Sequence, residues 1–330
     1  MLKWRQIQKD NFTKTKDLGK FLEIDLSYSS SFPLNLPKRL ASKIQKGTLD
    51  DPILKQFLPT EKEETPPPAF LEDPVCDTSF QKTPRLLHKY QGRALLVTTS
   101  ACAMHCRYCF RQNYPYNSNT NFSAELEIIQ KDPSIHEIIL SGGDPLSLSD
   151  ETLKLLIENL SVIPHLKLLR FHTRFPVGIP ERITDSFLEI LETSPLQTIF
   201  VIHVNHPQEL DKEIFAALKE VSRLGIPVLC QSVLLAGVND DHDTLKTLFL
   251  NLAKHGIIPY YLHQLDRIKQ GHHFEVSIEK GLALMEKLRK EIPGYALPKY
   301  VQEVPFETSK KEVRITSDPL SLDQEYKALV

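Results

Sequence analysis

The stretch that decides the fold is RALLVTTSACAMHCRYCFR, residues 93–111, in which an apolar, β-rich run leads directly into three closely spaced cysteines. Five similar apolar runs follow, at 137–142, 167–173, 197–203, 227–233 and 257–263, and their starts are 30 residues apart. That interval suits one strand plus one helix, and the segments between the runs, such as ETLKLLIENL (151–160), carry apolar residues at helical spacing. The sequence therefore predicts six βα units.

These runs are apolar nearly throughout, which is typical of parallel strands covered on both faces. We therefore predict an α/β fold with a partial, six-stranded parallel βα barrel, whose functional groups lie at the carboxyl ends of the strands. We expect residues 1–85 to form a mostly helical extension and linker, 86–292 the core barrel, and 293–330 a short C-terminal segment. The acidic and proline-rich stretch at 61–68 is expected to be a solvated linker.

The overall composition excludes several classes of function. The chain has 330 residues with 40 Lys+Arg against 42 Asp+Glu, a formal net charge of -2 that gives no basic field for nucleic acid. No apolar run approaches the roughly 18 residues that a membrane span requires, and the first residues lack the apolar core of a signal peptide. We expect a cytoplasmic protein with no nucleic-acid and no membrane partner.

The cysteines carry the first chemical signal. Cys102, Cys106 and Cys109 form a C-x-x-x-C-x-x-C triplet directly after the first strand of the core. Three such thiolates can hold three irons of a 4Fe-4S cluster and leave the fourth iron open. The spacing, the aromatic Tyr108 before the last cysteine and the place on the first βα loop favour this cluster.

A structural zinc site is the alternative interpretation of the triplet. It needs a fourth ligand, for which His105, Cys76 and Cys230 are available. If the cluster interpretation holds, Cys76 and Cys230 are expected to be ordinary packed or partly exposed thiols.

The triplet resembles the signature of the radical S-adenosylmethionine superfamily, which implies that the amino and carboxylate groups of this cofactor bind the open iron. In that superfamily the second strand typically ends in a glycine-rich turn that contacts the cofactor, and ILSGGDP (139–145) lies at the corresponding place. The resemblance thus assigns Gly142, Gly143 and Asp144 to S-adenosylmethionine, together with Gln231 at the end of a later strand.

A closer resemblance, to the lysine 2,3-aminomutase family, covers nearly all of residues 84–310. Its blocks are LLHKYQGRALL, CAMHCRYCFR, SGGDPL, HVNHPQEL, QSVLLAGVND, PYYLHQLD and PGYALPKYVQEV. The match is closest to the short EpmB branch, which acts in β-lysylation of elongation factor P, and DDPILKQFLP near the N-terminus also resembles that branch. The resemblance implies an isomerase that converts L-lysine to (R)-β-lysine, an electron donor such as flavodoxin or ferredoxin, and a functional link to elongation factor P and its lysyl ligase.

The family resemblance also implies a second cofactor, pyridoxal phosphate, held covalently by Lys310, with the adjacent Lys311 as the alternative. The segment around this lysine keeps the family's length but lacks its glycines. The resemblance assigns the other residues as follows: Lys89, Tyr90 and Arg93 to the pyridoxal phosphate, Arg111 to the substrate carboxylate, and Asp266 and Glu303 to the distal ammonium. His203, Asn205, His206 and Asn239 lie at strand ends and are expected to line the cofactor cavity, without individual roles.

Other functions remain open at this point. One is a stand-alone aminomutase that serves another pathway or another amino acid, although the chain ends 20 residues past Lys310, without the cysteine-containing extension of the longer relatives. Another is a radical enzyme that modifies RNA or protein without pyridoxal phosphate. The sequence does not decide the oligomeric state, and a homo-oligomer is compatible with it.

Overall fold

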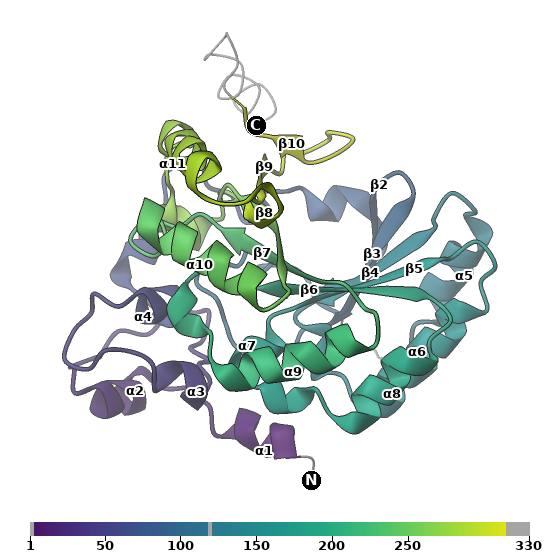
Figure 1. Ribbon diagram of the computed structural model, residues 1–330, viewed down its shortest axis with the longest axis horizontal. Helices are drawn as coiled ribbons and strands as arrows, with labels where there is room; N and C mark the ends of the chain where they lie inside the picture. The colour runs from purple at the N-terminus through teal and green to yellow at the C-terminus, as the bar shows by residue number, and fades with distance from the viewer. Residues whose placement is uncertain (1–2, 118–120, 315–330) are drawn as a thin grey trace.

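The structure is a computed structural model that describes residues 3–117 and 121–314. Within these ranges the chain forms one ten-stranded sheet in the order β1 to β10, with helices along it (Figure 1). The end of the C-terminal segment expected at 293–330 lies outside the described residues. None of the helices in the described ranges is long and apolar enough to cross a membrane.

The central strands confirm the predicted fold class. They are β3 (Arg93–Thr99), β4 (Glu137–Gly142), β5 (Leu168–Thr173), β6 (Gln197–His203), β7 (Val228–Val233) and β8 (Ile258–His263). Each is parallel to the next, and their bounds agree with the six predicted runs to within one residue. The order ends in β1 and β10 rather than joining them, so among the described residues the sheet is an open, partial barrel.

Four further strands extend the six that the sequence predicted. A seventh parallel strand, β9 (Lys299–Gln302), follows β8, and β10 (Lys311–Glu312) pairs with it in antiparallel fashion. On the other side β2 (Leu86–Tyr90) and β1 (Gln81–Thr83) are antiparallel. With two to five residues each and many polar side chains, these strands lack the apolar run by which the others were found.

Helices cover the outer side of the parallel strands. The long ones are α5 (Ser123–Lys131), α6 (Asp150–Ser161), α8 (Asp185–Thr193), α9 (Lys212–Arg223), α10 (His242–Lys254) and α11 (Ile278–Glu291). The chain also contains short helical turns: η1 (Glu61–Glu64), η2 (Asp77–Phe80), η3 (Pro145–Ser147), α7 (Phe175–Gly178), η4 (Pro180–Arg182), η5 (Pro207–Glu209), η6 (Lys269–Phe274) and η7 (Gly294–Ala296). Several helices begin at a side chain that accepts a backbone N–H, such as Ser149 before α6 and Asp241 before α10, which fixes where each helix starts.

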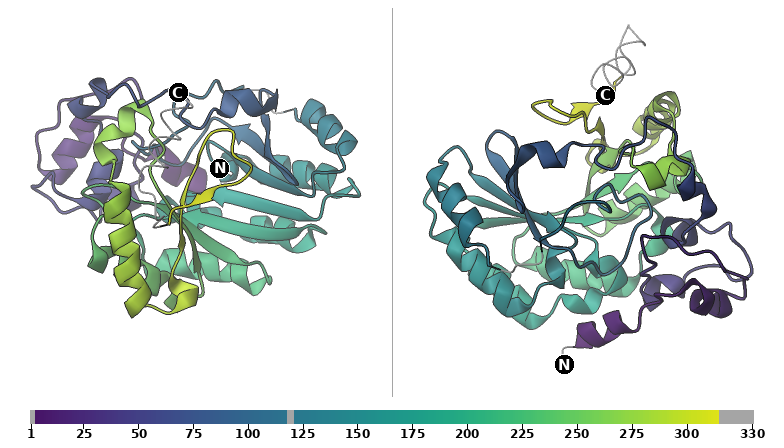
Figure 2. Two further views of the ribbon diagram at one scale, coloured as in Figure 1. Left: turned by 90° about the horizontal axis from the view of Figure 1, so that it is seen from above. Right: turned by 180° about the vertical axis from the view of Figure 1, so that it is seen from behind.

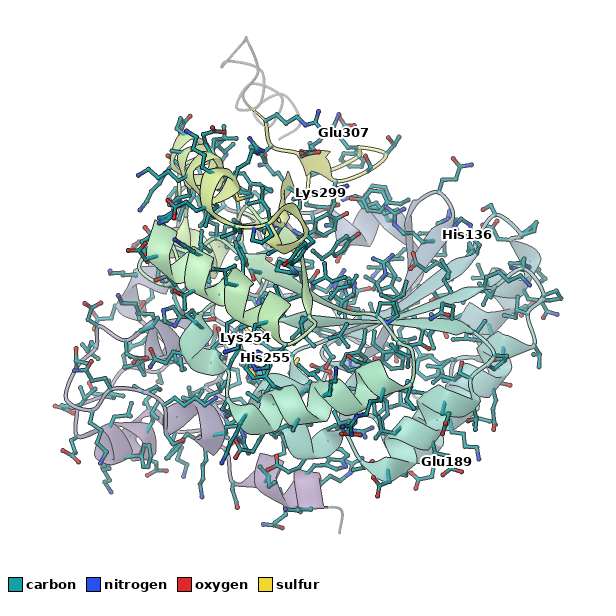
Figure 3. All side chains as sticks on the ribbon, viewed as in Figure 1. His136, Glu189, Lys254, His255, Lys299 and Glu307 are labelled. Atoms are coloured by element: carbon teal, nitrogen blue, oxygen red, sulfur yellow. The ribbon has the colours of Figure 1, made fainter. Side chains whose placement is uncertain are left out.

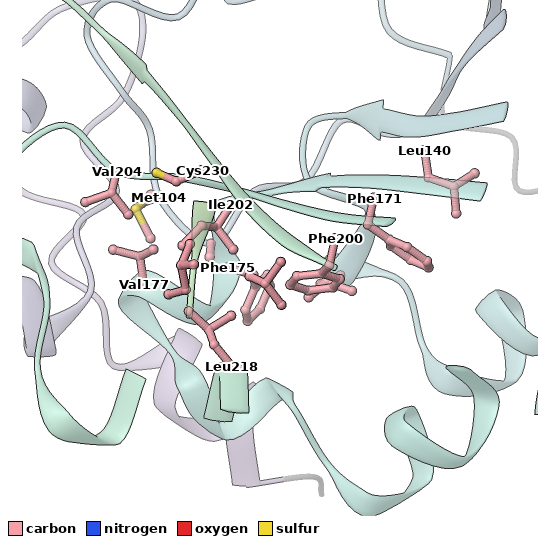
Figure 4. Packing of buried hydrophobic residues seen from close by; sticks show 14 of the residues in the cluster. Met104, Leu140, Phe171, Phe175, Val177, Phe200, Ile202, Val204, Leu218 and Cys230 are labelled. Carbon is pink, nitrogen blue, oxygen red and sulfur yellow. The ribbon is translucent and has the colours of Figure 1, made fainter. Parts of the chain in front are cut away.

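The main core lies between the sheet and this helical layer. Figure 4 shows Phe171 and Phe200, from β5 and β6, side by side above the helices, and their ring centroids are 5.9 Å apart. Cys230 of β7 is a free, buried thiol in the same core, as expected of an incidental cysteine. In Figure 3, Lys254 marks the end of α10 just before β8, and Lys299 marks the C-terminal segment.

The N-terminal extension packs against one end of the barrel and contains α1 (Lys3–Lys9), α2 (Thr15–Leu22), α3 (Lys38–Ala41) and α4 (Pro52–Phe57) (Figure 1). Trp4 is fully buried, edge-on to Phe175 at 5.4 Å between ring centroids. The expectation of a solvated linker at 61–68 is wrong at Glu63, which is 5% exposed and forms a buried ion pair with Arg107. Arg107, from the cysteine loop, compensates the negative charge of Glu63. The composition of residues 61–68 alone does not show this partner, because it lies more than 40 residues away in the sequence.

Candidate active site

A cavity of about 500 Å³ opens at the carboxyl ends of the parallel strands. The C-terminal segment with β9 and β10 passes over this end of the sheet (Figure 2). All the residues that the sequence assigned to cluster, cofactors and substrate line the cavity: Cys102, Cys106, Cys109, Gly142, Gly143, Asp144, Gln231, Lys89, Tyr90, Arg93, Arg111, Asp266, Glu303 and Lys310. His203 lines it too, but Asn205, His206 and Asn239, which were expected to do so, are not among the residues that line it. Asn205 and Asn239 are fully buried behind the wall, where Asn205 donates to the Tyr108 hydroxyl and Asn239 to the carbonyl of Val233.

The N-terminal extension holds the backbone of the cysteine loop. The carbonyl of Cys102 accepts hydrogen bonds from the side chains of Gln8 and Asn35, each at 3.2 Å. Arg107 is fully buried and also donates to the carbonyl of Phe32 at 2.7 Å. The loop that carries the three thiols is therefore fixed by residues from far away in the sequence.

The three thiols suit a metal cluster chemically. Burial raises the pKa of Cys102, and it raises the pKa of Cys109 to about 11. Thiols in such surroundings ionise only if a positive partner, such as iron, compensates the burial. Cys106 already has a cation at hand, since Arg174 donates to its sulfur at 2.8 Å.

Two of the three candidate fourth ligands of the zinc alternative, His105 and Cys230, have other contacts. The Nδ1 atom of His105 lies 2.9 Å from the carbonyl oxygen of Pro33, and its ring stacks on Phe32. Cys230 is in the main core. Among the described residues, no group of three His, Cys, Asp or Glu side chains is arranged to hold one metal ion.

The Gly-Gly turn after β4 is locked to the start of the cysteine loop. Gly143 donates its N–H to Thr99 O at 2.7 Å, and Asp144 donates its N–H to Ala101 O at 2.8 Å. A Cβ on Gly143 would lie 2.3 Å from Ala101 O, and Gly142 has a φ of +118°. Only glycines allow this approach, and it brings the turn against the cysteine loop.

The side chain of Asp144 is occupied by the protein itself. Its oxygens accept hydrogen bonds from the N–H groups of Leu146, Arg174 and Phe175 and from the hydroxyl of Thr173, at 2.7 to 3.0 Å. Burial raises its pKa to about 6, against the effect of these donors. The carboxylate therefore ties the turn after β4 to the end of β5.

Glu303 is the centre of a charged cluster at the lysine end of the cavity. Its carboxylate pairs with Lys310, lies 2.5 Å from Lys89 Nζ and accepts a hydrogen bond from Tyr90. Burial opposes its ionisation, but the two lysines outweigh this and lower its pKa to about 2. This group of charged side chains brings together residues from β2 and from both ends of the loop at 303–310.

The remaining predicted residues differ in their surroundings. Arg111 pairs through Nε with Asp77 at 2.7 Å, and the Arg93 guanidinium lies over the ring of Tyr90. Asp266 has a pKa raised to about 7 by burial, although Lys310 opposes this rise. The cavity thus combines cations suited to phosphate and carboxylate groups with an acid that a cation would ionise.

Comparisons with known proteins agree with this geometry. The profile of the radical SAM superfamily matches residues 96–248. An L-lysine 2,3-aminomutase of Escherichia coli is 39% identical over 93% of this chain and 93% of its own length. The chain belongs to the lysine 2,3-aminomutase family. Enzymes with the same name from Haemophilus influenzae (38% identical, 93% of this chain and 94% of theirs) and Clostridium subterminale (32%, 92% and 75%) are further relatives.

Membership of the lysine 2,3-aminomutase family makes this chain an enzyme of the isomerase type with a radical SAM domain. It supports the three expected cofactors: the 4Fe-4S cluster, S-adenosylmethionine and pyridoxal phosphate. The three thiols and the glycine turn fit the first two, and the cations around Lys310 fit the phosphate of the third.

Several residues that line the cavity of this aminomutase received no individual role from the sequence. Arg170 and His172 alternate on β5, and Arg174 follows the same strand. That alternation was visible in the sequence, because every second side chain of a strand points to one face. The pairing of Asp77 with Arg111 gave no such signal, since it joins residues from different parts of the chain.

Proposed function

We propose that the chain is an L-lysine 2,3-aminomutase that converts L-lysine to (R)-β-lysine and carries pyridoxal phosphate on Lys310. The observation that supports this most is that one cavity contains both the three cluster cysteines and Lys310 with its surrounding charges. An enzyme that modifies RNA or protein without pyridoxal phosphate gives no reason for this lysine to lie there.

Each cofactor has candidate residues. Cys102, Cys106 and Cys109 would hold the cluster, the Gly142–Gly143 turn and Gln231 would contact S-adenosylmethionine, and Lys89, Tyr90 and Arg93 would contact the pyridoxal phosphate. When bound, the cluster and S-adenosylmethionine supply a radical that abstracts hydrogen, and pyridoxal phosphate supplies a conjugated carrier for the migrating amino group. Because the Asp144 carboxylate is occupied, its part in cofactor binding is to position the glycine turn.

The charges of the substrate find matching groups in the cavity. Asp77 holds Arg111 through Nε, and the Ser141 hydroxyl lies 3.4 Å from NH1, so the guanidinium is oriented and keeps N–H groups on its terminal nitrogens for a carboxylate. Asp266 and Glu303 would face the distal ammonium. Burying such a charge without a partner costs several kcal/mol, which gives these residues their selectivity for a dibasic amino acid.

The wider setting is also part of the proposal. We assign residues 86–292 to the radical core and 293–330 to the segment that carries the pyridoxal phosphate. A one-electron donor such as flavodoxin or ferredoxin would reduce the cluster, and the free thiols of the described cysteines accord with a cytoplasmic location. The product would serve the lysyl ligase of elongation factor P, on the basis of the sequence resemblance.

An anaerobic assay tests the reaction. Protein with a reconstituted cluster is incubated with L-lysine, S-adenosylmethionine, pyridoxal phosphate and dithionite, and β-lysine is separated from α-lysine by chromatography. We expect β-lysine only when both cofactors are present, and a large loss of product in Arg111→Lys, which keeps the charge but not the planar fork. Turnover that needs no pyridoxal phosphate, or that occurs with another amino acid but not lysine, would refute the proposal.

A second assay tests the pathway. The purified product and α-lysine are offered in turn to an elongation factor P lysyl ligase, and modified elongation factor is measured by intact-protein mass spectrometry. The proposal expects faster ligation of the product, whereas equal or slower ligation favours a stand-alone aminomutase.

A further inference from the structure

Arg174 is a buried arginine that none of the roles above uses. It follows β5, is 7% exposed, and its NH1 donates to the sulfur of Cys106 at 2.8 Å and to the hydroxyl of Tyr108. A guanidinium is always charged, so a full positive charge lies in contact with one of the three cluster cysteines.

The other side of the same guanidinium is anchored. NH2 donates to Gln56 of α4 at 2.8 Å and to Glu209 of η5 at 2.6 Å. Glu209 is fully buried and also accepts the N–H groups of Asn205 and His206, each at 2.9 Å. Arg174 is thus held in one orientation by groups from the N-terminal extension and from the loop after β6.

A fixed cation at a cluster sulfur affects the redox chemistry of the cluster. On reduction, an oxidised 4Fe-4S cluster gains one electron from a low-potential one-electron donor such as reduced flavodoxin, and no bond forms or breaks. The reduced cluster carries one more negative charge, so a nearby cation and a hydrogen bond to a ligand sulfur favour it. Glu209, the counter-charge of Arg174, has the opposite effect.

We propose that Arg174 is a positioning residue that raises the reduction potential of the cluster through its contact with Cys106, and that the negative charge of Glu209 partly offsets this rise. The inference rests on the cluster assigned under the proposed function. It gives the N-terminal extension a part in the chemistry, because Gln56 of α4 orients the arginine.

The test is a redox titration of the reconstituted cluster, followed by electron paramagnetic resonance, with iron content measured in each sample. In Arg174→Gln we expect the equilibrium constant for reduction to fall at least tenfold, a shift of about 59 mV to more negative potential for one electron. In Glu209→Gln, which keeps the shape but removes the negative charge, we expect a shift in the opposite direction. A merely structural role would not give shifts of opposite sign.

Arg170→Gln is the matched control, since Arg170 comes from the same strand and lines the same cavity but pairs with Glu137. In this control, the equilibrium constant for reduction of the cluster should stay within threefold of the wild-type value. Should Arg174→Gln lose its iron, Glu209→Gln alone decides. Unchanged potentials in iron-replete variants, or shifts of the same sign, would overturn the inference, whereas a wild-type chain that assembles no cluster would refute the proposed function instead.

Discussion

Replacement of Gly143 by alanine tests how the cofactor turn is built. The added Cβ would lie 2.3 Å from Ala101 O and 2.7 Å from the Ser100 carbonyl carbon, and both are backbone atoms that cannot rotate away. The turn must therefore move off the cysteine loop, which weakens the bonds from Gly143 N to Thr99 O and from Asp144 N to Ala101 O. Overpacking of about 1–3 kcal/mol and about 1 kcal/mol for each of the two weakened bonds give an expected loss of about 3–5 kcal/mol in the free energy of unfolding.

Urea unfolding and S-adenosylmethionine binding by calorimetry measure the outcome for Gly143→Ala. Gly294→Ala is the matched control, since its Cβ would meet nothing within 4 Å, and we expect a change within about 0.5 kcal/mol. The affinity of reconstituted Gly143→Ala for S-adenosylmethionine should fall, while the control binds as the wild type. Wild-type stability and affinity in Gly143→Ala would refute the close approach of turn and loop.

Three further variants probe charged groups. The pKa of Asp266 is raised to about 7, so the affinity for lysine, measured by calorimetry, should rise with pH through about 7, and Asp266→Asn should abolish that rise. Glu303 has a pKa lowered to about 2, so the stability that its ionised form contributes is complete above its ordinary pKa of 4.5 and is lost as the pH falls through about 2. At pH 7, Glu303→Gln should therefore lower the free energy of unfolding in urea by about 2–3 kcal/mol, and this loss should become smaller in acid. Arg107→Met strands the buried Glu63 and should cost about 3–5 kcal/mol, so an equally stable variant would contradict the buried pair.

The sequence predicted six of the seven parallel strands in the described ranges, because these six segments are largely apolar and begin at a regular interval. It could not predict β9, whose four residues KYVQ carry no such run and become a strand only by pairing with β8. Pairing energy of this kind comes from the neighbouring strand and leaves little trace in the segment itself.

In the candidate site, too, the sequence predicted some residues and not others. The cysteines, the glycine turn and the residues around Lys310 were found through motifs, and the structure brings them to one cavity. The partners that hold them, such as Asp77 for Arg111 and Glu63 for Arg107, were not found. An ion pair between segments far apart in the chain follows from the fold alone, so the solvated linker expected at 61–68 is wrong at Glu63, whereas the other residues of that stretch are exposed or half-buried.

The central claim is that Lys310 carries pyridoxal phosphate in the cavity that also contains the cluster cysteines. Lys310 lines that cavity, whereas the adjacent Lys311 pairs with Glu307 at 3.1 Å and is more exposed. Borohydride reduction of the cofactor-loaded wild-type protein, followed by peptide mass spectrometry, locates the modified lysine directly. The account predicts the pyridoxyl group on Lys310; its presence on Lys311 or Lys89, or its absence from a cluster-replete protein incubated with the cofactor, would contradict it.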